Sequence, residues 1–246
     1  SFGMRVLLIF YSLGMQLLYW LLQKLRERLS SRLQSQIAGR EWNDARLAEV
    51  KLLRSKAKSA IVYFCSSAGE YEQAKPLIER FAAEHQEIMQ HIIFFSFSGF
   101  HFAEVRGEAT PFSLAPPDTI WHWERILGAL DPTTVVIVRH ELWPAFLVAA
   151  RQWAKVVLIN AHREPVEMHF FRRLVLRVLF RGLDQIFTVK KEDVDLFTES
   201  TGFARSNMAF CGDTKYDRVL NAPLSQGDVL HDQWVGERKV LVAGST

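Results

Sequence analysis

Apolar and polar positions alternate along the chain in blocks that predict strands and helices in turn. Short continuous apolar runs indicate buried strands, and longer runs with apolar residues every three to four positions indicate helices. The expected strands cover residues 60–65, 91–97, 134–138, 156–160, 185–189 and 208–211. The expected helices cover residues 70–85, 119–130, 144–153, 169–181 and 191–199. Continuous apolar strands that alternate with helices predict an α/β fold: a Rossmann-like parallel sheet with helices on both faces.

The first long apolar run, residues 4–23, is expected to form a membrane-anchor helix that begins at a natural start, Met4. Nineteen or so residues at ~1.5 Å each reach about 29 Å, close to the thickness of a bilayer's hydrocarbon core. Such a single anchor followed by cations favours an orientation with the rest of the chain in the cytoplasm. The cations are Lys24, Arg26, Arg28 and Arg32. Because Gln16 and Tyr19 weaken the span, a core or interfacial helix is the alternative.

The remaining chain divides into three expected parts. Residues 24–58 read as a basic helical connector, either solvated or placed as a basic collar on an anionic membrane surface. Residues 59–220 form the Rossmann-like domain. Residues 221–246 read as a linker and the first strand of a further domain, because the apolar run at 239–246 needs neighbouring strands to complete its hydrogen bonds.

Composition narrows the classes of function. With 49% hydrophobic and 23% charged residues the chain is an ordinary globular protein, and a net charge of +3 does not predict a nucleic-acid partner. CxxC and HExxH are absent, so no metal site is expected. Cys65 and Cys211 each follow an apolar run, and both are expected to be buried strand ends in a reduced compartment.

Motifs with chemical potential stand where strands end. Rossmann-like sheets bind ligands in the loops at the carboxyl ends of their strands. The motifs are CSSAGE (65–70), SFSG (96–99), RHELWP (139–144), NAHREP (160–165) and CGDTKYD (211–217). Each is weak alone, but five convergent loops indicate a cleft. A GxSxG nucleophile elbow is absent, which disfavours hydrolase chemistry.

Glu70 is the candidate of most interest. At the start of a helix, free N–H groups and the dipole favour a negative charge, so Glu70 reads as a helix-start charge. The alternative, which these residues alone favour less, is a general base, with Ser66, Ser67 and Gly69 allowing a substrate close to the backbone. Both interpretations stay open on these residues alone.

Three other charges allow two interpretations each. Glu141, before Trp143-Pro144, is either an acidic cap or a cleft residue. Arg163 and Lys215 either meet a phosphate or carboxylate or are ordinary surface cations.

Together these loops resemble the 3-deoxy-D-manno-octulosonate (Kdo) transferase family. The family's A-S-x-G-E-aromatic loop is similar to residues 66–71, with serine replacing alanine, and its S/T-G turn to Ser98-Gly99. Residues 141–144 match half of its E-T-E-L-W-P loop. Asn160-Ala161, CGDTKYD and the closing VAGST follow in the family's order. The resemblance covers nearly the whole chain from Met4.

The resemblance implies the N-terminal, acceptor-binding half of a two-domain type B (GT-B) glycosyltransferase at the cytoplasmic face of the inner membrane. Such an enzyme transfers Kdo with inversion from CMP-Kdo to the 6-hydroxyl of a glucosamine in lipid A precursor (lipid IVA), in lipopolysaccharide biosynthesis, without cofactor or metal. Glu70 would then be the general base. The acceptor-binding residues would be Ser66, Ser67, Gly69, Ser98, Gly99, Glu141 and Arg163. Lys215, Gly244 and Ser245 would lie on the donor side.

The chain departs from the family pattern at two places. Arg139-His140 replaces Glu-Thr before Glu141, and His162 stands where many members have arginine. Two rival functions therefore remain: a type B glycosyltransferase with another lipid acceptor, and a non-catalytic lipid- or protein-binding module. This chain alone is expected to be inactive, because most of the CMP-Kdo site would lie in the C-terminal domain.

Overall fold

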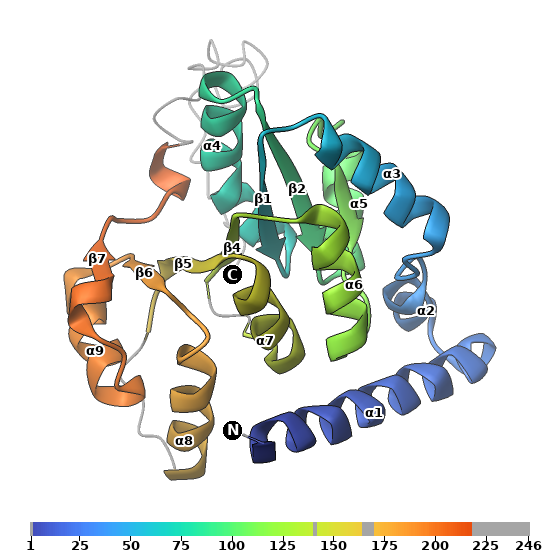
Figure 1. Ribbon diagram of the computed structural model, residues 1–246, viewed down its shortest axis with the longest axis horizontal. Helices are drawn as coiled ribbons and strands as arrows, with labels where there is room; N and C mark the ends of the chain where they lie inside the picture. The colour runs from blue at the N-terminus through green and yellow to red at the C-terminus, as the bar shows by residue number, and fades with distance from the viewer. Residues whose placement is uncertain (1, 140–141, 164–169, 218–246) are drawn as a thin grey trace, which may run out of the picture.

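Seven parallel strands form the centre of the computed structural model, which describes residues 2–139, 142–163 and 170–217 (Figure 1). The strand order in this described part is β3-β2-β1-β4-β5-β6-β7, and every pairing is parallel. The strands are β1 (Ser59–Cys65), β2 (Ile88–Phe94), β3 (Phe112–Leu114), β4 (Thr134–Val138), β5 (Lys155–Ala161), β6 (Gln185–Thr188) and β7 (Met208–Phe210). The expected Rossmann-like α/β fold is confirmed.

Helices connect the strands and cover both faces of the sheet. They are α4 (Ala68–Glu84), α5 (Phe97–Val105), α6 (Ile120–Leu130), α7 (Pro144–Trp153), α8 (Phe170–Phe180) and α9 (Lys191–Thr201). Before β1 stand α1 (Phe2–Lys24), α2 (Ser31–Ile37) and α3 (Asp44–Ser55). Short 3-10 turns are at Arg26–Arg28 and Arg205–Asn207.

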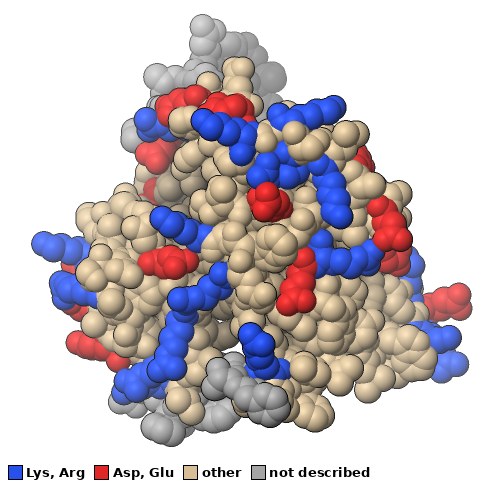
Figure 2. All heavy atoms as spheres, viewed as in Figure 1, with Lys and Arg blue, Asp and Glu red and all other residues tan. Residues whose placement is uncertain are grey.

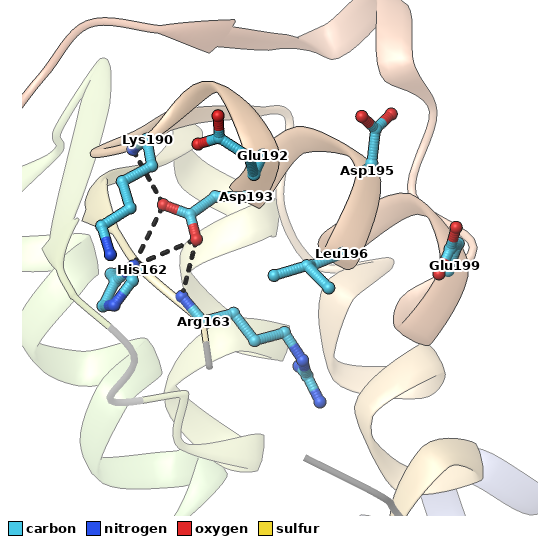
Figure 3. Close-up of a pocket in the computed structure, with 8 residues that line it drawn as sticks. All are labelled: His162, Arg163, Lys190, Glu192, Asp193, Asp195, Leu196 and Glu199. Carbon is cyan, nitrogen blue, oxygen red and sulfur yellow. Dashed lines mark hydrogen bonds and ion pairs between the residues drawn. The ribbon is translucent and has the colours of Figure 1, made fainter. Parts of the chain in front are cut away.

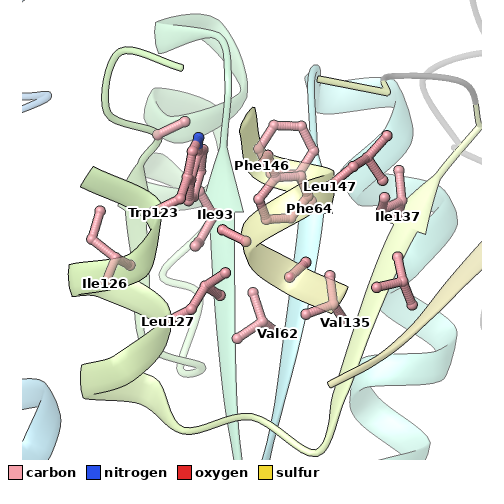
Figure 4. Close-up of a cluster of buried hydrophobic side chains, with 14 of the residues drawn as sticks. Val62, Phe64, Ile93, Trp123, Ile126, Leu127, Val135, Ile137, Phe146 and Leu147 are labelled. Carbon is pink, nitrogen blue, oxygen red and sulfur yellow. The ribbon is translucent and has the colours of Figure 1, made fainter. Parts of the chain in front are cut away.

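Alternate residues of each strand feed two separate cores, because successive strand side chains point to opposite faces. On β1, Val62 and Phe64 face α3, α6 and α7, whereas Ile61, Tyr63 and Cys65 face α4 and α5. Figure 4 shows the first core, in which the ring of Phe146 stacks on that of Phe64 at 4.6 Å between centroids. This double burial explains the continuous apolar strands of the sequence.

Two elements were not expected from the sequence, and one strand is displaced. The helix α5 begins at Phe97, where a strand was expected to end, since Ser96 caps the helix by accepting a hydrogen bond from Gly99 N. The β2 strand accordingly ends at Phe94. The strand β3 has only three residues, too few to form a periodic pattern.

The segment before β1 is built into the domain. Arg40 is 8% exposed, and its guanidinium donates to the carbonyl oxygens of Gln36, Phe95 and Ala115. Trp42 Nε1 donates to the carbonyl oxygen of Leu114 at 3.0 Å. The second half of the basic connector therefore packs on the ends of β2 and β3.

The two cysteines differ, although both were expected to be buried. Cys65 is the buried last residue of β1, but Cys211 is exposed. The prediction for Cys211 was wrong because β7 is an edge strand whose last residues are exposed.

The first helix is long and apolar enough to cross a membrane. Residues Arg5–Lys24 have a mean hydropathy of 1.6, and only 6% of this stretch is buried. Figure 1 shows α1 lying across the lower edge of the molecule, beneath α6 and α7. Residues 218–246, with the expected strand at 239–246, lie outside the described residues.

Candidate functional site

The direction of the chain across the sheet reverses at β1. From β1 the chain moves outward through β2 and β3, then returns to place β4 on the other side of β1. In open α/β sheets this switch point opens a crevice at the carboxyl ends of the two central strands. The loop with Glu70 follows β1, and the loop with Glu141 follows β4. His140 and Glu141 lie outside the described residues.

Glu70 is held in the first turn of α4. Its side chain is buried, with 6% of the residue exposed. Ser66 donates twice to Glu70 Oε2, from its backbone N and from its hydroxyl, both at 2.5 Å. Ser67 is the helix N-cap and accepts a hydrogen bond from Glu70 N at 3.3 Å. Ser66 thus holds the carboxylate of Glu70, and Ser67 holds its backbone N–H.

The loop after β2 packs directly on the Glu70 loop. Ser96 N donates to the carbonyl oxygen of Ser66 at 3.1 Å. A methyl group added at buried Gly99 would lie 2.9 Å from Phe94 Cδ1 and 3.1 Å from the carbonyl carbon of Ser67. Gly99 therefore permits the close approach of the two loops. Ser98 is exposed and contacts the hydroxyl of Ser96 at 3.1 Å.

The Asn160 and CGDTKYD motifs meet on α4, one turn after Glu70. Thr214 Oγ1 donates to the carbonyl oxygen of Gln73 at 2.5 Å, and Asn160 Nδ2 donates to Thr214 Oγ1 at 2.7 Å. Thr214 N returns a hydrogen bond to Asn160 Oδ1 at 3.2 Å. Gln73 Nε2 also reaches both oxygens of Asp213 at 3.3 and 3.4 Å. These contacts join the ends of β5 and β7 to the helix that carries Glu70.

The backbone of Asn160 explains its residue type. Its φ of 51° lies in the left-handed region, which asparagine tolerates better than most residues. The register of β5 against β6 shifts between Leu158 and Ala161. The Asn160-Ala161 motif therefore marks a distortion that turns the asparagine toward Thr214.

The loop after β4 is anchored on both sides of its undescribed part. Arg139 has a left-handed φ of 68°, and its backbone N donates to the carbonyl oxygen of Ile159 at 2.9 Å. The ring of Trp143 stacks on Phe95 at 4.5 Å between centroids. Within the described residues, Arg139 Nε and Trp143 Nε1 are buried without a hydrogen-bond partner.

Asp118 connects this edge of the sheet to α1, a role that the sequence did not reveal. Its buried carboxylate accepts from Tyr11 Oη at 2.8 Å and from Trp123 Nε1 at 2.7 Å. It also accepts from the backbone N of Ala145 and Phe146, at 3.2 and 2.9 Å, and so caps α7. The available sequence signal was an aspartate after Pro116-Pro117, directly before a helix.

A cavity of about 580 Å³ opens at the ends of β5 and β6. Asp193 is its buried anchor and accepts from His162 Nδ1 at 3.0 Å, Arg163 N at 3.1 Å and Lys190 N at 2.8 Å. Figure 3 shows Asp193 pointing from α9 toward these three residues. The Arg163 guanidinium lies 5.9 Å from the Phe197 ring. Three further acids line the cavity, namely Glu192, Asp195 and Glu199.

The expected site residues thus fall into separate groups. Ser66, Ser67, Gly69, Glu70 and Gly99 lie together at the β1 and β2 ends. Arg163 lies in the cavity at the β5 end. Lys215 is exposed and pairs with Asp213 at 3.5 Å. Gly244 and Ser245 lie outside the described residues.

Three titratable groups inside the domain have pKa values shifted by their surroundings. Burial opposes ionisation of Glu108, but hydrogen bonds from Lys75 and Tyr71 outweigh it and lower the pKa of Glu108 to about 2. Burial, with a smaller effect of Arg46, lowers the pKa of His91 to about 3. Burial and then the neighbouring Glu70 carboxylate raise the pKa of the Cys65 thiol well above its ordinary value.

Metal chemistry has no ready site in the described part of the chain. Among residues 2–139, 142–163 and 170–217, no three His, Cys, Asp or Glu side chains are grouped to hold a metal ion.

Comparison with known proteins gives a family and a fold. A family model described as 3-Deoxy-D-manno-octulosonic-acid transferase (kdotransferase) matches residues 27–218. A crystal structure of UDP-N-acetylglucosamine 2-epimerase is similar with a TM-score of 0.56 and 13% identity, over 73% of this chain and 55% of that one. A putative UDP-N-acetylglucosamine 2-epimerase from Listeria monocytogenes gives a TM-score of 0.55 and 13% identity, over 73% and 51%. The chain spans about half the length of these two proteins, and at this identity the likeness concerns the fold alone.

Proposed function

Because the chain belongs to the 3-deoxy-D-manno-octulosonic-acid transferase family, we propose that it is the acceptor-binding half of an inverting glycosyltransferase. The enzyme would transfer Kdo from CMP-Kdo to the 6-hydroxyl of a glucosamine in lipid A precursor, in lipopolysaccharide biosynthesis. It would act at the cytoplasmic face of the inner membrane, attached through α1. The donor would bind mainly to a C-terminal domain, with Lys215, Gly244 and Ser245 on the donor side.

The observation that carries this proposal is the setting of Glu70. Its carboxylate is buried at the switch point of the sheet and is fixed by two hydrogen bonds from Ser66. A carboxylate that only stabilises a helix start can stay on the surface, and it does not need a hydrogen bond from a neighbouring hydroxyl such as that of Ser66. A general base does need a defined position, because proton transfer requires hydrogen-bond contact with the reacting group.

In the proposed reaction, Glu70 accepts the proton of the acceptor hydroxyl. The hydroxyl oxygen attacks the anomeric carbon of Kdo on the face opposite CMP. The new C–O bond forms as the bond between that carbon and the CMP phosphate oxygen breaks, and CMP leaves with the bonding electrons. The configuration at the anomeric carbon is inverted. We expect no metal or other cofactor in this step.

The acceptor contacts proposed for this half follow the grouping of the loops. Ser66, Ser67 and Gly69 border Glu70, and Ser98 lies on the adjoining loop, so these residues would meet the sugar. Gly99 would contribute by holding the two loops together. Glu141 and Arg163 would contact more distant parts of the acceptor.

The test is the substitution Glu70→Gln in the full-length protein, with transfer from CMP-Kdo to lipid A precursor as the measurement. Loss of a general base lowers the rate by about 10²- to 10⁴-fold. The matched control is Glu79→Gln, on the same helix but with its side chain 64% exposed, which should keep the wild-type rate. A near wild-type rate for Glu70→Gln would contradict the assignment. Assays with other lipid acceptors, made on the same protein, separate this function from that of a related transferase.

A further inference from the structure

The helix α1 has its polar and apolar faces reversed relative to a surface helix of a water-soluble protein. Residues that face the domain recur every three or four positions and include most of its polar side chains: Tyr11, Ser12, Gln16, Tyr19 and Gln23. Residues that face outward are large and apolar: Leu7, Ile9, Phe10, Leu13, Leu17, Leu18, Trp20 and Leu21. A surface helix normally presents its polar face to water.

The polar face is bonded to the domain near both ends of the helix. Near the N-terminal end, Tyr11 donates to Asp118, and Ser12, which is fully buried, accepts from Ile120 N at 3.1 Å. Near the C-terminal end, Tyr19 donates to the carbonyl oxygen of Ile37 at 3.3 Å. A helix upright in a bilayer would carry these groups into hydrocarbon and lose their partners, at a cost of several kcal/mol for each unsatisfied group.

The ends of the helix fit the boundary between lipid and water. α1 contains no acidic residue, and exposed cations stand at both ends: Arg5, Lys24, Arg26 and Arg28. Exposed Trp20 has Lys24 Nζ 5.7 Å from its ring, a pairing suited to the headgroup region. Figure 2 shows a mostly uncharged surface along the lower edge, where Figure 1 places α1, with both basic and acidic side chains near the right-hand end. Exposed Glu27 stands between Arg26 and Arg28, but the net charge of this end remains positive.

We propose that α1 lies flat in the surface of an anionic bilayer, with its outward apolar face in the lipid and its polar face against the domain. A helix of this kind inserts about 5 to 10 Å into the boundary of headgroups and acyl chains. The occupant of this face is therefore a lipid surface, and α1 does not span the membrane. This specifies the attachment assumed in the proposed function.

The flat helix also orients the rest of the molecule. Asp118 and the first turns of α6 and α7 lie at the carboxyl edge of the sheet, and α1 contacts them through Tyr11 and Ser12. Glu70 lies at that same edge. The bilayer would thus face the sheet edge that carries Glu70, so that a lipid-linked sugar reaches Glu70 without leaving the membrane.

A depth measurement distinguishes the two orientations. Spin labels are placed on single cysteines at Phe10, Leu13, Leu17 and Leu21, in a Cys211→Ser background, and the chain is bound to vesicles of phosphatidylethanolamine and phosphatidylglycerol. We expect nearly equal depths for all four labels. A spanning helix would instead separate the labels at Phe10 and Leu21 by about 16 Å. A steady change of depth along the helix would overturn the proposal.

Two controls complete the test. A label at Val105, an apolar residue that is 73% exposed at the opposite edge of the sheet, should stay in water. The double substitution Leu13→Glu and Leu17→Glu should abolish vesicle binding without changing the far-ultraviolet circular dichroism, whereas Val105→Glu should leave binding unchanged. If the α1 labels instead contact one another in a dimer and never enter lipid, the face belongs to a second copy and the proposal fails. None of these readouts depends on Kdo transfer, so they can fail independently of the proposed function.

Discussion

Replacing Thr214 by valine should destabilise the chain although the two side chains have nearly the same shape. The substitution removes the hydroxyl that donates to the carbonyl oxygen of Gln73 and accepts from Asn160 Nδ2. A net loss of about 1 kcal/mol per hydrogen bond, plus about 1 to 2 kcal/mol for leaving the buried Asn160 amide without its acceptor, gives about 3 to 4 kcal/mol. Urea unfolding in detergent, followed by tryptophan fluorescence, measures this change.

The expected shift of the urea midpoint is about 1.5 to 2 M at an m-value of about 2 kcal/mol/M. Thr214→Ser keeps the hydroxyl and should lose less than about 1 kcal/mol. Substituting the adjacent, exposed Lys215 by methionine should have almost no effect on stability. If Thr214→Val shifts the free energy of unfolding by less than about 0.5 kcal/mol, then this contact does not hold the β7 loop on α4.

Two further expectations concern the same domain. Gly99→Ala should lower the free energy of unfolding by about 1 to 3 kcal/mol, because its methyl group would overlap the Phe94 ring and the Ser67 backbone. Ser98→Ala, at the exposed neighbouring position, is the control. Equal stability of the two variants would contradict the packing role of Gly99. Acid should weaken the fold in two steps, because His91 and Glu108 both have folded-state pKa values below their ordinary ones. The stability contributed by neutral His91 is complete above pH ~6.5 and falls as the pH drops toward about 3, by up to about 1.4 kcal/mol per pH unit. The stability contributed by ionised Glu108 is lost between about pH 4.3 and pH 2. Urea unfolding at pH 7, 5 and 4 checks this, and equal free energies at pH 7 and 5 would exclude the His91 contribution.

The local sequence pattern was sufficient to predict strands that are buried on both faces and helices that begin at a proline. β4 and α7 have the predicted bounds, since Thr134–Val138 is continuously apolar and Pro144 starts a helix. By contrast, α5 reads FSGFHFAEV, in which apolar and polar residues are mixed around the helix, so it lacks the one-sided periodicity that identifies an amphipathic helix. A run of small residues ending in Glu70 after a buried strand was enough to suggest the first group of site residues.

Long-range partners could not be read from the sequence. Tyr11 and Asp118 are 107 residues apart, and Gln73 and Asp213 are 140 apart. Nothing local to Gln73 indicates that its amide will hold the β7 loop. Likewise, the reversed faces of α1 became meaningful only when the domain beneath it was known, because a stripe of five polar residues in an apolar helix fits several environments.

The buried guanidinium of Arg40 sets a limit on how the chain can be shortened. It binds carbonyl oxygens at the ends of β2 and β3, and Trp42 closes the core beside it. A truncation that starts at β1, on the view that everything before it serves only as an anchor, would leave these carbonyl groups without donors and expose the core. A version intended to stay in solution should therefore begin between α1 and α2. In the N-terminal quarter of the chain, α1 can thus be removed, whereas the part with Arg40 and Trp42 is needed for the fold. The boundary between them falls within residues 24–58, a segment that looks uniformly basic in the sequence.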